Sequence, residues 1–175
     1  MTALNRTPIN TNNLQASKFI LAFGRIPTIQ YFCQTANIPG VSLGSYDLNT
    51  PLLDVPVAGN KLSYNEFNVT FYINEDVSSF NELYKWFLAI AAPTSITDRN
   101  RFNGQQNTNT VKQSYYSDST LTIMSALNNP IARVNFHRMF PVSLSDIQFD
   151  TTQSADTIIT ADAVFRYEYF DITNA

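Results

Sequence analysis

The chain has 175 residues, which is long enough to bury a core, and because 44% of them are apolar and 13% aromatic we expect the chain as a whole to be ordered. Charged residues make up only 14%, against about 25% in an average domain, which predicts that other subunits cover much of the surface. The net charge of −3 and the lack of any Lys/Arg run disfavour tight binding of nucleic acid.

The first elements in chain order are an arm and a hairpin. Residues 1–16 are rich in Asn and Thr and predict a flexible N-terminal arm in front of a single domain at 17–175. Apolar residues alternate in "SKFILAFG", "RIP" predicts a turn, and "TIQYFCQTA" resumes an extended run, which together predict a β-hairpin. No leader or bilayer-spanning run is recognisable, so we expect no membrane insertion of the subunit.

The segment 38–62 is rich in Pro and Gly and shows no sustained period, yet it is unusually apolar for a loop. A free subunit has little reason to expose such residues, so we predict a long loop that contacts a neighbouring subunit. Gly59 is expected to adopt a backbone conformation that other residues disfavour. The residues predicted at this subunit interface are Leu52, Leu53, Val55, Pro56, Val57, Ala58, Gly59 and Lys61.

A half-buried strand and the one substantial helix come next. Between residues 66 and 73, Phe67, Val69, Phe71 and Ile73 alternate with polar residues, the period of a strand with one dry face. The apolar residues that follow recur at helical spacing and predict a helix over 78–92. Ser79 and Glu82 match a capping box at its start.

The remaining sequence predicts β-structure after a polar, Asn/Gln-rich loop at 94–114. "STLTIMSAL" and "IARVNFHRMF" flank a turn, and "TIITADAVFRYEYFDI" reads as one terminal strand. On that strand Asp162 and Glu168 alternate away from the aromatic face, so they are candidates for the lumen or the outer wall of a barrel. The predicted fold is therefore mainly β, a barrel or sandwich with one α-helix.

The residues that could be catalytic or bind a metal lack the further residues that such a site requires. His137 has no recognisable nucleophile motif to serve, and Cys33 is expected to be a small buried hydrophobe. Asp146, Asp150 and Asp156 fail the calcium-loop pattern and predict a solvated turn. We therefore expect no catalytic residue, no cofactor and no metal, and a subunit that polymerises.

Four stretches in a fixed order resemble a known family. They are "FCQTANIPG", "VPVAGNKLSYNEFNVTFYINED", "LYKWFLAIAA" and "MFPVSLSDIQFD", followed by an aromatic terminal strand. The most specific part is the Pro-x-Ala-Gly loop (Pro56, Ala58, Gly59) with the Asn-Glu-Asp step at 74–76. From about Phe19 to Ile172, this order resembles the tail tube protein of contractile-tailed bacteriophages.

The resemblance implies a β-barrel with one helix, hexameric rings, and a stack of rings that forms a hollow tube in the virion. It implies a sheath protein, baseplate proteins and a tail terminator as partners, assembly in the host cytoplasm, and passage of DNA through the lumen without specific binding. Two alternatives share nearly every feature: a ring paralogue that initiates or ends the tube, and the tube protein of a type VI-like injection system. A monomeric β-sandwich binding module is the alternative of another class.

Overall fold

The computed structural model describes residues 12–91, 115–154 and 157–174. The chain in these ranges forms nine strands and two helices: β1 (Phe19–Phe23), α1 (Pro27–Phe32), β2 (Cys33–Ala36), β3 (Val41–Asn49), β4 (Asp54–Tyr64), β5 (Phe67–Tyr72), α2 (Ser78–Ala91), β6 (Ser117–Met124), β7 (Pro130–Leu144), β8 (Thr160–Arg166) and β9 (Tyr169–Asn174). This composition confirms the predicted mainly-β fold, to which α1 adds a short helix that the sequence pattern did not indicate.

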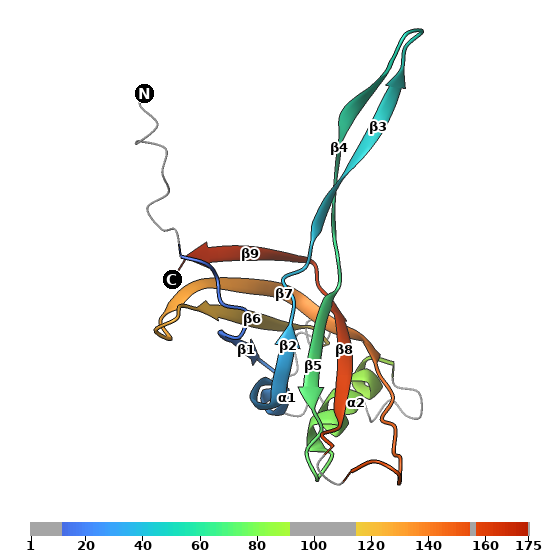
Figure 1. Cartoon of the computed structure of the whole chain (residues 1–175). Coiled ribbons are helices and arrows are strands. Elements are labelled where there is room, and N and C mark those ends of the chain that lie inside the picture. The colour runs from blue at the N-terminus through green and yellow to red at the C-terminus, as the bar shows by residue number, and fades with distance from the viewer. Residues whose placement is uncertain (1–11, 92–114, 155–156, 175) are drawn as a thin grey trace, which may run out of the picture.

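Two layers of antiparallel strands share the long strand β7 (Figure 1). The first layer runs β1, β6, β7, β9, and the second runs β7, β8, β5, β2. Residues 132–137 of β7 pair with β9, whereas residues 140–144 pair with β8. One strand therefore joins the two layers through its own backbone.

The change of layer occurs at Arg138, whose φ of 53° is uncommon for a residue other than glycine. Its backbone N–H donates to Asp118 Oδ1 at 2.9 Å, and its guanidinium lies 3.3 Å from Glu168 Oε2. The same guanidinium stands over the ring of Tyr116 at 4.7 Å. These three contacts stabilise a backbone conformation that Arg138 would otherwise disfavour.

An aromatic core fills the space between the layers. The rings of Phe67 on β5 and Phe136 on β7 lie 4.5 Å apart, and Phe165 on β8 contacts Phe23, Phe67 and Trp86. Trp86 is fully buried and donates its indole N–H to the carbonyl of residue 115 at 2.8 Å. Of the residues predicted on the dry face, Phe67, Val69 and Phe71 on β5 are confirmed as core, whereas Ile73 lies just beyond β5 and is partly buried against that core.

The helix expected over 78–92 runs from Ser78 to Ala91, but the predicted capping box is wrong. Ser79 is buried in the first turn and donates to the carbonyl of Tyr72, while Glu82 accepts from Thr28 Oγ1 at 2.7 Å. Asn74 takes the capping role, because its Oδ1 accepts from the backbone N–H of Ser79 at 3.3 Å. No helix in the described ranges is long and apolar enough to cross a membrane.

Two expectations about strand connectivity are wrong. The N-terminal hairpin does not form, because Pro27 occupies the first turn of α1 and Ile29 turns inward to the core; β1 pairs with β6, and β2 with β5. The single terminal strand divides into β8 and β9, which pair with different parts of β7.

The predicted loop at 38–62 is mostly a hairpin. Among the described strands, β3 and β4 pair only with each other, and they project away from the other strands, with the helices near the opposite end (Figure 1). The predicted arm at 1–16 and polar loop at 94–114 lie largely or wholly outside the described residues.

Candidate assembly surface

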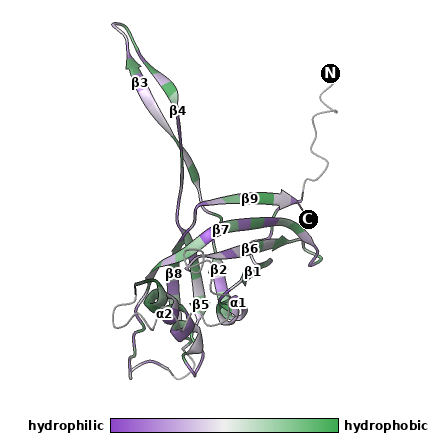
Figure 2. Ribbon diagram, turned by 180° about the vertical axis from the view of Figure 1, so that it is seen from behind, coloured by the Kyte–Doolittle hydropathy of each residue, from purple (hydrophilic) through white to green (hydrophobic). Residues whose placement is uncertain are grey.

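The β3–β4 hairpin is an apolar element that none of the other described residues covers. Every residue of β3 is exposed, and Leu52 and Leu53 in the connecting turn are 98% and 68% exposed. Figure 2 shows hydrophobic segments along this hairpin, well away from the packed strands. All eight residues predicted at an interface belong to it: Leu52 and Leu53 in the turn, and Val55, Pro56, Val57, Ala58, Gly59 and Lys61 in β4.

Apolar cross-strand pairs form two separate patches on the hairpin. Near the body the pairs are Val41–Tyr64 and Leu43–Leu62, and nearer the tip they are Tyr46–Val57 and Leu48–Val55. Strand alternation places the first two pairs on one face of the ribbon and the last two on the other. The sequence showed no sustained period because the apolar residues change face in the middle of the segment.

The change of face falls where Gly44 and Gly59 meet. The register shifts between Leu43 and Ser45, and a Cβ on Gly59 would lie 2.6 Å from the carbonyl oxygen of Gly44. No described glycine has a positive φ, so the expectation of a disfavoured backbone conformation at Gly59 is wrong. Glycine is required at this position because the two backbones approach closely.

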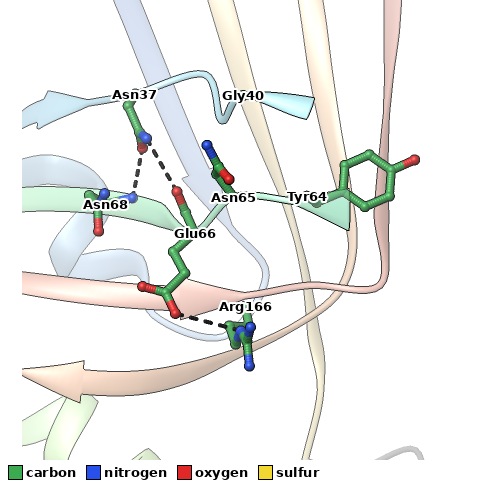
Figure 3. Close-up of a pocket in the computed structure, with 7 residues that line it drawn as sticks. All are labelled: Asn37, Gly40, Tyr64, Asn65, Glu66, Asn68 and Arg166. Carbon is green, nitrogen blue, oxygen red and sulfur yellow. Dashed lines mark hydrogen bonds and ion pairs between the residues drawn. The ribbon is translucent and has the colours of Figure 1, made fainter. Parts of the chain in front are cut away.

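The root of the hairpin is firmly attached to the body (Figure 3). The Asn37 amide continues the ladder between β2 and β5, accepting from the Asn68 N–H at 2.7 Å and donating to the Glu66 carbonyl at 3.2 Å. The backbone N–H of Asn65 donates to the Gly40 carbonyl at 2.9 Å. These bonds fix both strands of the hairpin where they leave the sheet.

Aromatic rings reinforce the same root. Tyr64 at the end of β4 contacts the rings of Tyr167 and Phe170 at 5.8 and 5.5 Å. The Tyr167 hydroxyl donates to the carbonyl of Asn65 at 2.8 Å, and burial, with a smaller contribution from Tyr64, raises the pKa of Tyr167 to about 12. That phenol therefore stays protonated and donating over the whole neutral range.

The two lumen candidates occupy separate strands. Asp162 lies on β8 and accepts from Thr70 Oγ1 at 2.7 Å across the β5–β8 pair. Glu168 lies in the connection between β8 and β9 and pairs with Arg138. Both side chains are exposed, but the structure does not align them on one strand face as the sequence pattern suggested.

A polar cluster that the sequence did not reveal joins β9 to β7. Asp171 accepts from the Asn135 amide at 3.0 Å and contacts His137 Nε2 at 2.6 Å, and these hydrogen bonds, that of Asn135 first, lower the pKa of the Asp171 carboxyl. The imidazole also stacks on Tyr169 at 4.5 Å. Only the pairing of β7 with β9 brings these residues together, so spacing along the chain gave no signal.

The other residues considered for catalysis or metal binding make contacts that are typical of structural residues. The Cys33 thiol is half-buried, donates to the Thr35 carbonyl at 3.5 Å, and has its pKa raised by burial to about 11, so it is protonated at neutral pH. Asp150 accepts from the backbone N–H and hydroxyl of Thr152 within a turn. The described residues contain no group of three potential metal ligands, and Asp156 lies outside them.

A β-rich body with a projecting, uncovered apolar hairpin defines a class of protein, the structural subunit that completes its surface by assembly. Residues 4–173 match the model of the family described as phage tail tube protein, and the chain belongs to that family. It is a structural protein of the tail tube or tube terminator kind, and not an enzyme.

Similarity extends along the whole chain. The chain is 23% identical over 168 residues to the tail tube terminator protein of Enterobacteria phage T4, covering 92% of this chain and 89% of that protein. It shares its fold with the tube terminating cap of the anti-feeding prophage, with a TM-score of 0.63, 14% identity and complete coverage of both chains. The sheath–tube complex of the extracellular contractile injection system PVC matches with a TM-score of 0.56, 13% identity and 94% coverage of each chain.

Proposed function

We propose that this chain forms the ring that terminates a phage tail tube. The observation that carries the proposal is the match over nearly its full length to the T4 tail tube terminator, a relative named for that role. The likeness to the tube terminating cap over the whole of both chains agrees with it at the level of fold.

The uncovered hairpin supports a ring subunit over a free monomer. Its two apolar patches lie on opposite faces of the ribbon, so a partner on one side alone leaves one patch in water. A ring supplies a neighbour on each side of every subunit, and a ring on a tube adds a contact along the axis. In this proposal the ring is a hexamer, its partners are tube and sheath proteins, and DNA passes through its lumen during ejection.

Electron microscopy of the purified chain tests the proposal. We expect single rings with a central hole, which bind one end of preformed tail tubes and stop further growth. Long tubes from the chain alone would instead identify it as the main tube subunit, a role favoured by the fold match to the PVC sheath–tube complex. A monodisperse monomer that binds no tube would contradict both roles.

A further inference from the structure

A second exposed surface lies at the end of the subunit opposite the β3–β4 hairpin. It consists of the turn between β5 and α2, residues 73–77, and of the connection between β7 and β8, described at 145–154 and 157–159 (Figure 1). The backbone N–H of Ile73 donates to the carbonyl of Ile159 at 3.0 Å, so the two segments lie side by side. We call this surface the loop end.

The loop end exposes one aromatic and one large aliphatic side chain. Phe149 is 80% exposed and Ile158 is 66% exposed, although both are apolar. Exposure of a phenyl ring to water is unfavourable, and aromatic side chains are enriched where one protein covers another. These side chains therefore indicate that a partner covers this end of the subunit.

The loop end carries negative charge. Its four described carboxylates, all exposed, are Glu75, Asp76, Asp146 and Asp150. The backbone N–H and the hydroxyl of Thr152 donate to Asp150 and lower the pKa of its carboxyl, which is therefore ionised at neutral pH. The sequence has no Lys or Arg at 62–84 or 139–165, and Lys85 follows about two turns into α2. Such a surface attracts a basic partner and repels an acidic one.

The tip of the hairpin carries charge of the same sign. Asp47 and Asp54 are both exposed, and residues 45–60 contain no Lys or Arg. The one cation of the two hairpin strands is Lys61, which lies on the body side of the contact between Gly44 and Gly59. The two ends of the subunit are therefore both acidic.

Two acidic ends are unfavourable for a stack of identical subunits. In a head-to-tail stack along the hairpin, the tip of one copy meets the loop end of the next (Figure 1). Asp47 and Asp54 would then face the carboxylates of the loop end, and like charges across a contact weaken it. A basic partner would instead pair with these carboxylates while it covers Phe149.

We propose that the loop end docks a protein other than this chain, one whose contacting surface carries Lys or Arg side chains around an apolar site. The acidic tip and the acidic loop end keep rings of this chain from stacking on one another. The inference rests on the proposed terminating ring, and it adds the charges that limit the chain to one ring.

Reversing the charge of either end turns the chain into its own basic probe. Asp47→Lys with Asp54→Lys gives a basic tip and leaves the loop end acidic. In about 0.05 M NaCl, where screening is weak, these rings should form head-to-tail stacks while parent rings stay single. The reciprocal variant combines Glu75→Lys, Asp76→Lys and Asp146→Lys and should stack in the same way. Sedimentation and electron microscopy measure the stacked fraction, which we expect to rise about tenfold or more.

Reversal of both ends at once is the matched control. All five lysines in one chain restore like charges at the contact, so these rings should again be single. A nonspecific effect of added positive charge would instead give the most stacking in this variant. The stacks formed by either single-end variant should dissociate as NaCl is raised to about 1 M, because salt screens the attraction.

The apolar part of the surface has its own test. Phe149→Ser in the variant with the basic tip should lower the stacked fraction about tenfold, because the ring no longer covers apolar surface on the next copy. Leu127→Ser, at a similarly exposed site in the turn between β6 and β7, should leave the fraction unchanged.

The outcomes separate this inference from the proposed function. Single rings from both single-end variants, or equal stacking after reversal of both ends, would overturn the docking surface and leave the ring intact. A parent chain that forms no rings, or that forms long tubes in the same salt, would overturn the proposed function itself.

Discussion

At the scale of single residues, the close approach of Gly44 and Gly59 leaves no room for a side chain at position 59. Gly59→Ala should push the hairpin strands apart, because its Cβ would lie 2.6 Å from the backbone oxygen of Gly44. A backbone oxygen cannot move aside as the end of a flexible side chain can. Gly44→Ala is the matched control, since its Cβ would meet Lys61 O at an ordinary 3.7 Å. Hydrogen exchange in β3 and β4 should accelerate in the first variant and not in the second, and equal exchange in both would contradict the reason given.

Asn74 is the second residue with a defined local effect. Asn74→Ala should lower the free energy of unfolding by about 1 kcal/mol, because the first turn of α2 loses its side-chain acceptor. Glu75→Ala, one position further and exposed, should change it by less than about 0.5 kcal/mol. Urea denaturation measures the free energy of unfolding of both variants. Equal effects would mean that Asn74 does not cap the helix.

The Asp171 carboxyl gives a pH-dependent prediction. Its pKa is lowered in the folded chain, so it contributes stability above its ordinary pKa of 3.8, and that contribution is lost as the pH falls through the lower folded value. Asp171→Asn should therefore lower the melting temperature at pH 7, with the difference from the parent shrinking below pH 3.8. Asp47→Asn on the exposed hairpin is the control, and a difference that stays constant with pH would contradict the account.

At the scale of elements, the β3–β4 hairpin is expected to serve assembly and not the subunit's own stability. Val57→Asp should leave the melting temperature unchanged but block assembly, because an unpaired carboxylate buried at a contact costs about 3–5 kcal/mol. Asn49→Asp adds the same charge to the polar side of the hairpin and should assemble normally. Sedimentation measures both; assembly by Val57→Asp, or its unfolding as a monomer, would show that the hairpin packs on its own chain.

The sequence pattern predicts some of the elements and not others. Buried alternation revealed β5, and helical spacing revealed α2, because one solvent-free face sets each pattern. The hairpin was missed as a pair of strands because neither strand has a buried face and the apolar residues change sides at Gly44. The cluster of Asn135, His137 and Asp171 was missed because it depends on strand pairing, which spacing along one chain does not encode.

At the scale of the whole molecule, Asp162 and Glu168 are the residues predicted to face the lumen. Asp162→Lys with Glu168→Lys should slow genome ejection if both face the lumen, because cations there would attract phosphate. Asp162→Asn with Glu168→Gln controls for the lost contacts to Thr70 and Arg138. Ejection kinetics of assembled phage are the measurement, and normal kinetics in the lysine variant would exclude the lumen assignment.

The shared strand β7 also has a mechanical meaning. A pull along its axis strains the hydrogen bonds to β6, β8 and β9 together, in shear, whereas a pull across the strands at one end of β1 opens its bonds to β6 one after another. Shortening of a contractile tail exerts force on every part of it. Such force crosses from one layer of this subunit to the other through covalent bonds, and side-chain packing need not transmit it.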